Sequence, residues 1–287
     1  MNEYQIGSKL TRGTFLKSAA AGTAALMAVS MFPGCGTRKT IALGVQLYSL
    51  RNTMPSDVAG HLAGIKAIGY EGIEFAGYYD LEAKALRQML DDNGLECFGS
   101  HLQLNVLLGD RFEETVEVNQ ILGNKRLVVA SMGGGVDTID AWKQMAETFN
   151  GIAEKVRPLG MTVGFHNHTI EFTPIDGQVP LDLFYNQTHK EVFLQLDTGH
   201  AVHAGVDPVA YIEKFPGRIP SIHAKEWTES NPAALIGEGD VNWPQVLHAC
   251  ETVGGTEVYI VEEESDAYPG LEGIDLSLQN LKKFINA

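Results

Sequence analysis

The stretch 192–200, which reads VFLQLDTGH, places an acid and an imidazole directly after an apolar run. The run lacks the alternation of a half-exposed strand and is typical of a strand buried on both faces. Asp197 ends the run, and His200 follows three residues later. The carboxyl ends of buried parallel strands are where α/β proteins carry their chemistry. We therefore expect other strands to bring further polar side chains to the same place.

The ends of the other apolar runs are also rich in polar residues. Of the nine histidines, those at or just beyond predicted strand ends are His101, His166, His168, His200, His203 and His223. Further candidates at these ends are Gln46, Tyr48, Arg51, Glu74, Asn167, Glu171, Lys225, Glu226, Glu262 and Glu264. Carboxylate and imidazole crowded together indicate a site for one divalent metal ion, Mn²⁺, Zn²⁺ or Mg²⁺.

Such a site predicts a particular kind of chemistry. A mixed carboxylate and imidazole site binds one cation and leaves positions open for substrate oxygens. The adjacent carbonyl and hydroxyl of a sugar can bind there, and the polarised carbonyl acidifies the hydrogen on the neighbouring carbon. A carboxylate or imidazole on each side of the substrate then removes and returns that proton. Titratable groups beyond four ligands suit this acid–base work.

Regularly alternating elements must position these side chains. The predicted strands are 41–47, 72–75, 97–101, 126–130, 161–166, 192–197, 219–223 and 257–262. The predicted helices are 58–68, 81–90, 112–122, 138–156, 181–186, 208–215, 244–252 and 276–285. Eight strand–helix pairs without a linker predict a single (β/α)₈ TIM barrel over 41–287 rather than a doubly wound sheet. No Gly-x-Gly-x-x-Gly follows the first strand, which disfavours a dinucleotide-binding fold.

Charge and the first forty residues limit the partners and the location. The 287-residue chain has 21 basic and 36 acidic residues, a formal net charge of −15, which disfavours binding to a nucleic-acid backbone. A basic stretch before a short Ala-rich apolar run predicts an export signal at 1–35. Cys35 ends an imperfect lipobox and is a candidate for lipid attachment. Cys97 and Cys250 are expected to be buried thiols.

Several motifs carry a resemblance to a known family. They are GVQLYSLR at 44–51, FHNHTIEF at 165–172, DTGH at 197–200, HAKE at 223–226, GEG at 237–239 with Asn242 and Trp243, and IVEEE at 260–264. In this order, over 41–287, the chain resembles the xylose isomerase-like TIM barrel superfamily in its sugar isomerase/epimerase branch. The resemblance implies a metal-dependent enzyme acting on sugars.

The resemblance also implies a metal-ligand set. In that family a Glu, an Asp, a His and a Glu from strands five to eight hold the metal. Asp197, His223 and Glu262 match the last three. The fifth-strand position departs, because this chain has His166 followed by Asn where relatives have Glu. We expect Glu171 to reach back as the fourth ligand.

Alternatives remain open for the fifth strand. His166 or His168 can take the ligand position, and the residue not used becomes a candidate acid or base beside Glu262. His200 matches the family's substrate-binding histidine. The other substrate-binding candidates are His101, Glu74, Lys225, Gln46 and Tyr48.

These features together predict an exported, metal-dependent sugar isomerase or epimerase that transfers a proton through a metal-held enediolate. The alternatives are a dehydratase or lyase acting on keto-sugars or 3-keto-glycosides with the same site, and a non-catalytic sugar-binding barrel. The acidic charge opposes an endonuclease IV-type nuclease. The expected partner is a free sugar or glycoside rather than a phosphorylated one, and a homodimer is expected from the resemblance.

Overall fold

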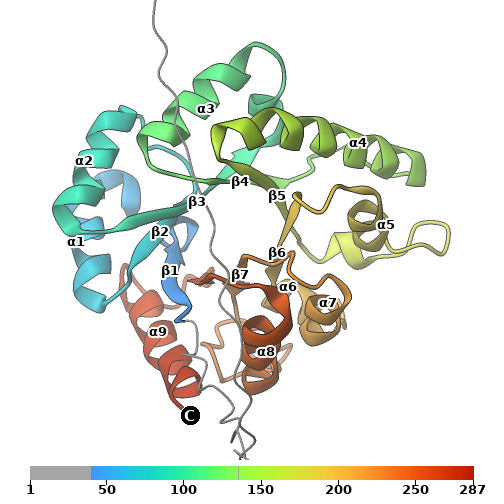
Figure 1. Cartoon of the computed structure of the whole chain (residues 1–287). Coiled ribbons are helices and arrows are strands. Elements are labelled where there is room, and N and C mark those ends of the chain that lie inside the picture. The colour runs from blue at the N-terminus through green and yellow to red at the C-terminus, as the bar shows by residue number, and fades with distance from the viewer. Residues whose placement is uncertain (1–39, 135) are drawn as a thin grey trace, which may run out of the picture. The chain divides into compact units, whose positions relative to one another are not determined.

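Eight parallel strands close into a barrel in the computed structural model, which describes residues 40–134 and 136–287 (Figure 1). The strands follow one another around the barrel in chain order, and β1 pairs with β8 to close it. Their bounds are β1 Ala42–Gln46, β2 Gly72–Phe75, β3 Glu96–Gln103, β4 Arg126–Ser131, β5 Thr162–His166, β6 Phe193–Asp197, β7 Ser221–Ala224 and β8 Val258–Val261. The predicted (β/α)₈ barrel is confirmed.

Helices surround the barrel of the described residues (Figure 1). They are α1 Val58–Ile68, α2 Ala83–Asn93, α3 Phe112–Ile121, α4 Ile139–Val156, α5 Pro180–Gln187, α6 Thr198–His203, α7 Pro208–Lys214, α8 Trp243–Ala249 and α9 Glu272–Ile285. The largest differences from the predicted helices concern α6 and α9. The short helix α6 was not expected, and α9 begins four residues earlier than the apolar periodicity indicated.

An aromatic cluster fixes β5 against its covering helices. Phe149 of α4 and Phe184 of α5 pack edge-on at 4.9 Å between ring centroids, and Phe165 of β5 lies 6.3 and 5.8 Å from them. All three are fully buried, and losing one such ring from a core costs about 3–5 kcal/mol. Since neighbouring strand residues point to opposite faces, a Phe165 that faces the helices directs His166 into the barrel.

Other predictions concern the cysteines and the chain's first residues. Cys250 is buried and Cys97 half-buried, and both are free thiols as expected. Among the described residues, no helix is both long enough and apolar enough to cross a membrane. The predicted export signal at 1–35 and the lipid attachment at Cys35 lie outside the described residues and stay predictions.

Candidate metal centre

Four buried side chains meet at the carboxyl end of the barrel. His166 ends β5, Asp197 ends β6, His223 lies in β7 and Glu262 follows β8. One ligand atom from each lies within 4.8 Å of the others. The Nδ1 atom of His223 is 3.1 Å from Oε2 of Glu262 and 3.9 Å from Oδ2 of Asp197. We call these four residues the metal set.

The metal set contains two polar atoms that lack a hydrogen-bond partner among the described residues. They are Nδ1 of His166 and Oδ2 of Asp197. An unsatisfied buried polar atom costs about 1–3 kcal/mol. The other oxygen of Asp197 is used, since Oδ1 accepts a hydrogen bond of 2.7 Å from the backbone N–H of His200 and so caps α6. Two imidazoles and two carboxylates are a donor set that fits a divalent cation, which would displace the protons of its ligand nitrogens.

Glu74 of β2 organises the side chains next to the metal set. It is fully buried, and it accepts hydrogen bonds of 2.7 Å from Gln46, Gln195 and Nε2 of His223. His101 lies 3.0 Å from the same carboxylate. Burial alone would raise the pKa of Glu74, but the imidazoles of His101 and His223 lower it well below its usual range. We call Gln46, Glu74, His101 and Gln195 the positioning set.

This arrangement fixes which nitrogen of His223 is available. An ionised carboxylate only accepts, so Nε2 of His223 donates to Glu74 and Nδ1 faces Glu262. Burial disfavours the charged imidazole, but Glu262 and Glu74 on its two sides raise the pKa of His223 to about 10. A carboxylate that holds the far nitrogen of a ligand histidine is the usual outer partner in protein metal sites.

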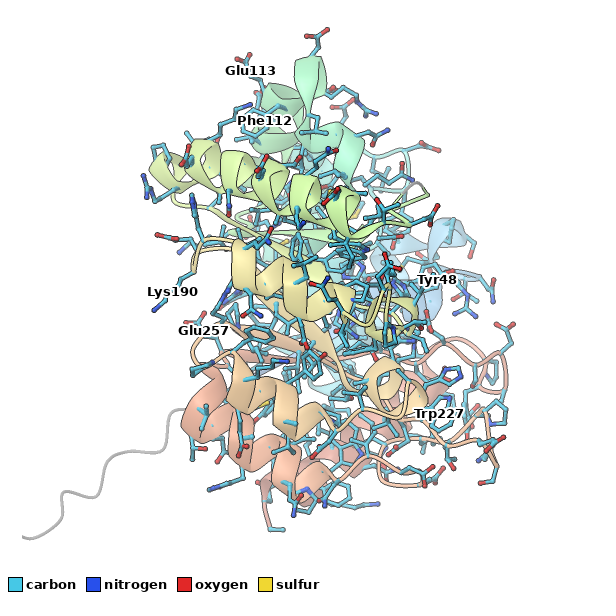
Figure 2. The ribbon with its side chains drawn as sticks, turned by 90° about the vertical axis from the view of Figure 1, so that its right-hand side faces the viewer. Tyr48, Phe112, Glu113, Lys190, Trp227 and Glu257 are labelled. Atoms are coloured by element: carbon cyan, nitrogen blue, oxygen red, sulfur yellow. The ribbon has the colours of Figure 1, made fainter. Side chains whose placement is uncertain are left out.

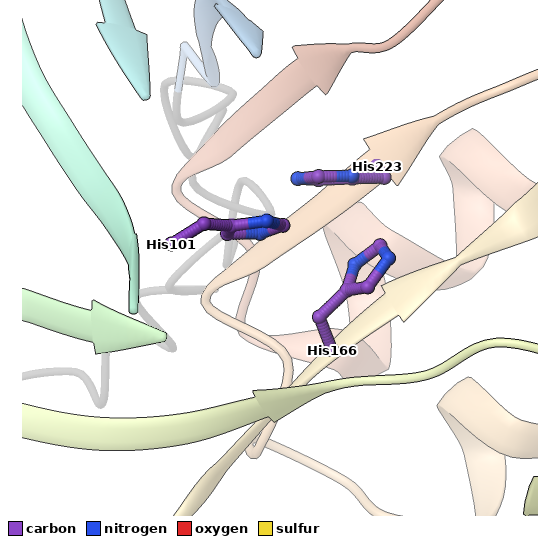
Figure 3. Close-up of side chains that lie close together, drawn as sticks. All are labelled: His101, His166 and His223. Atoms are coloured by element: carbon purple, nitrogen blue, oxygen red, sulfur yellow. The ribbon is translucent and has the colours of Figure 1, made fainter. Parts of the chain in front are cut away.

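His101 lies beside the metal set, but its Nε2 atom already contacts other side chains. Its ring stacks on that of His223 at 5.1 Å and 10°, while the ring of His166 is tilted against both (Figure 3). Ligand atoms of these three histidines also come within 4.8 Å of one another. However, Nε2 of His101 lies 2.7 Å from the side-chain oxygen of Gln195 as well as near Glu74. The mixed metal set therefore suits a cation better than the three histidines.

Glu171, the expected fourth ligand, lies outside the metal set. Glu171 lies in a short 3₁₀ turn, Ile170–Phe172, and its Oε2 accepts a 2.7 Å hydrogen bond from the backbone N–H of His168. It belongs to none of the ligand groups found among the described residues. Burial raises its pKa. The turn folds Glu171 back onto its own loop, so His166, the alternative reading of the sequence, takes its place in the metal set.

Two more histidines and a lysine lie at the rim of the centre. The rings of His168 and His200 are 4.9 Å apart. Burial, and then the charge of Lys225, lowers the pKa of His200 to about 4, and burial followed by His200 lowers the pKa of His168. Lys225 Nζ is 3.5 Å from both Nε2 of His200 and Oε2 of Glu262, and it pairs with Glu264. Near neutral pH both imidazoles are therefore uncharged.

Two cavities open beside the metal set. The smaller, about 330 Å³, is lined by Tyr48, Ala76, His101, Leu102, Gln103, Ala130, Ser131, His166, His168, Glu262 and Glu264. The larger, about 780 Å³, shares Glu262 and Glu264 with it and adds His200, Lys225 and the loops after β7 and β8. Tyr48 and Trp227 lie on the same side of the barrel, opposite Lys190 and Glu257 (Figure 2). Both cavities therefore open at the carboxyl ends of the strands.

The structure separates the predicted substrate-binding residues into two groups. Tyr48 is 45% exposed at the rim, and His101, His200 and Lys225 line the cavities. Gln46 and Glu74 are instead fully buried and hydrogen-bond to each other, which gives them a positioning role.

Sequence reasoning missed the role of Gln195. Its amide donates to Glu74 and to Ser221, and its oxygen lies 2.7 Å from Nε2 of His101. A polar residue in the middle of an otherwise apolar strand, two residues before Asp197, was the available signal.

A closed (β/α)₈ barrel with a buried His/Asp/Glu cluster at its carboxyl end defines a class of barrel enzymes with a candidate metal site. The chain belongs to the xylose isomerase-like TIM barrel family, whose model matches residues 62–284.

Individual relatives agree with this membership. The inosose dehydratase of Erwinia tasmaniensis is 28% identical over 239 residues, which cover 69% of this chain and 79% of that protein. A sugar phosphate isomerase/epimerase from Parabacteroides distasonis is 26% identical with a TM-score of 0.75, covering 87% of this chain and 97% of that one. The structure of an IOLI protein with a bound zinc atom shares the fold at 16% identity and a TM-score of 0.67, covering 85% and 96% of the two chains.

Proposed function

We propose that the protein is a divalent-metal-dependent sugar isomerase or epimerase that transfers a proton next to a carbonyl. The observation that carries the proposal is the metal set, in which Nδ1 of His166 and Oδ2 of Asp197 have no hydrogen-bond partner within residues 40–134 and 136–287. The relatives named as sugar phosphate isomerase/epimerase and inosose dehydratase support a sugar-like substrate.

The residues around the metal set can supply both steps of the reaction, polarisation of a carbonyl and removal of a proton. A divalent cation bound by the metal set would polarise a sugar carbonyl and so acidify the hydrogen on the next carbon. Burial raises the pKa of Glu262, but Lys225 and His223 lower it well below its usual value. Glu262 therefore stays ionised and can take up that proton.

Epimerisation requires a second group on the other face of the substrate. His168 lines the smaller cavity together with Glu262, and its lowered pKa keeps the imidazole uncharged. Glu262 would take the proton from one face of the carbon, and His168, after its imidazole has gained a proton from solvent, would return one to the opposite face and so invert that carbon. If both transfers involve Glu262, the hydrogen moves between neighbouring carbons and the outcome is isomerisation.

Solvent-deuterium exchange tests the proton transfer. The Zn²⁺- or Mn²⁺-loaded protein is incubated in D₂O with D-fructose, D-tagatose, D-xylulose and D-psicose, and exchange at carbon is followed by NMR. Glu262→Gln should reduce exchange by about 100-fold or more, the usual size of a general-base effect. Glu113→Gln, the same change at an exposed residue of helix α3, should leave the exchange unaltered. Undiminished exchange by Glu262→Gln would overturn the role of Glu262.

A dehydratase is the second candidate, favoured by the inosose dehydratase relatives and by the position of Lys225. Its ammonium lies 3.5 Å from Glu262, and neighbouring carboxylates raise its pKa against the effect of burial. A protonated amine beside the base can give a proton to a departing hydroxyl or glycosidic oxygen. A product lighter by one water or by one alcohol, detected by mass spectrometry, would identify this reaction, whereas an isomeric product would exclude it.

We also propose that the chain is exported, with residues 1–35 as its signal. Cell fractionation of a tagged protein should find it outside the cytoplasm, and Cys35→Ala should release it from membranes if Cys35 carries a lipid. A cytoplasmic location would contradict the proposal.

A further inference from the structure

We infer that the larger cavity binds the second sugar unit of an uncharged glycoside whose first ring lies at the metal set. This inference rests on the proposed function and narrows its substrate class. The two cavities share Glu262 and Glu264, so a molecule at the metal set can extend from one into the other. The larger has more than twice the volume of the smaller, about 780 against 330 Å³. A single ring leaves most of this space unfilled.

A buried carboxylate holds the outer wall of the larger cavity in place before any ligand binds. Glu226 accepts hydrogen bonds from the backbone N–H groups of Trp227, Gly237 and Val241 and from the indole N–H of Trp243. These four bonds tie the loop after β7 to the start of α8. A ligand therefore meets a wall that is already ordered, and it does not bear the entropic cost of ordering the loop.

An aromatic pair provides a surface that suits a sugar ring. The rings of His203 and Trp227 stack at 4.6 Å and 15°, and both residues line the larger cavity. His203 is exposed and Trp227 half-buried. Neither residue has a part in the proposed proton transfer. Large rigid rings with a polar edge give contact area to the apolar face of a sugar at little entropic cost.

The charge of the cavity selects against phosphorylated ligands. Among the described residues that line it, Lys225 is the sole Lys or Arg, and it is paired with Glu264. The carboxylates of the lining are Glu226, Glu229, Glu262, Glu263, Glu264 and Asp266. Arg51 neutralises Asp266 from outside the lining, but the balance stays negative. The hydroxyls of a neutral sugar can donate to such oxygens, whereas a phosphate would be repelled.

Binding by neutral disaccharides tests the inference. Dissociation constants of the Zn²⁺-loaded protein are measured by ligand-observed NMR for cellobiose, maltose, lactose and trehalose, and for D-glucose and D-galactose. At least one disaccharide should have a dissociation constant at least about fivefold lower than those of its component monosaccharides, since one aromatic contact contributes about 1 kcal/mol. Trp227→Ala should remove this gain, His203→Ala should reduce it, and Trp227→Phe should restore part of it. Phe112→Ala, a half-buried aromatic on α3, should retain it.

Each outcome decides the inference separately from the proposed function. The inference is overturned if no disaccharide gains over its monosaccharides, if the gain survives both Trp227→Ala and His203→Ala, or if D-glucose 1-phosphate binds more tightly than D-glucose. If the inference is overturned but monosaccharides still exchange deuterium, the proposed function is retained. The converse result is a metal-loaded protein that binds a disaccharide more tightly in a way that depends on Trp227, yet catalyses no deuterium exchange. That result supports the second sugar site in the larger cavity and contradicts the proposed proton transfer.

Discussion

The two sets of buried polar side chains inside the barrel differ in how their hydrogen bonds are satisfied. In the positioning set, Glu74 receives bonds from residues of four other strands, and Gln195 connects it to His101. In the adjacent metal set, His166 and Asp197 each keep a buried atom without a hydrogen-bond partner in the part of the chain that the structure describes. A satisfied network holds side chains in place, whereas buried unsatisfied atoms are costly and mark a place where something else binds. We therefore propose that the positioning set orients its neighbours and that the metal set binds a ligand.

Replacing one histidine from each set should give the largest difference in metal affinity. His166→Ala removes a proposed ligand, so Zn²⁺ affinity should fall by at least about 100-fold. His101→Ala removes contacts to Gln195, Glu74 and the ring of His223 but no proposed ligand, so the loss should stay within about tenfold. Calorimetric titration with Zn²⁺ measures both. Equal losses would show that the two sets do not differ in function.

Removing the metal should destabilise the wild-type protein. At free Zn²⁺ about 100-fold above its dissociation constant, binding stabilises the folded state by about 2.7 kcal/mol. For a chain of this size that corresponds to a rise in Tm of about 5–10 °C, which EDTA should reverse. In His166→Ala the same treatment should change Tm little. An unchanged Tm in the wild type would contradict the role of the metal set.

Glu74→Gln tests whether the positioning set acts through His223. A glutamine has one accepting oxygen, so it cannot satisfy Gln46, Gln195 and His223 together. We expect Zn²⁺ affinity to fall about 10–100-fold, the usual effect of losing an outer partner of a ligand histidine. The stoichiometry at saturating Zn²⁺ should stay unchanged, which separates a positioning residue from a ligand. Loss of the site at saturation would place Glu74 among the ligands.

Glu171→Gln should have the smallest effect on the metal. The amide oxygen can still accept the hydrogen bond from the backbone of His168, so Zn²⁺ affinity should change less than about threefold, within the net contribution of one hydrogen bond. A loss comparable to that of His166→Ala would restore Glu171 as the fourth ligand.

The barrel was predictable because its signals are local. Each strand is a short apolar run with a helical period after it, and Asp197, His223 and Glu262 stand at the ends of such runs. The structure brings these three side chains together, since all parallel strands end at the same side of a barrel. The six-residue helix α6 was not predictable from periodicity, because it is too short to show one.

The remaining features depend on contacts across the barrel that no sequence pattern contains. His166 rather than Glu171 joins the metal set because the turn 170–172 folds the glutamate back onto its own loop. Gln46 and Glu74 were expected at the substrate, yet the register of β1 against β2 pairs them in the interior. Side-chain reach within a loop and strand register are three-dimensional quantities, so neither follows from residue spacing alone.

We expect the metal set to bind one divalent cation, and the metal content of the purified protein measures this binding. The protein is reconstituted with Zn²⁺ or Mn²⁺, dialysed, and its metal content measured by mass spectrometry beside that of Asp197→Asn. The asparagine keeps an oxygen to cap α6 but replaces the unpartnered carboxylate oxygen. We predict one metal ion per wild-type chain and far less than one in the variant. A wild-type protein that retains no metal, or a variant that retains as much, would contradict the account.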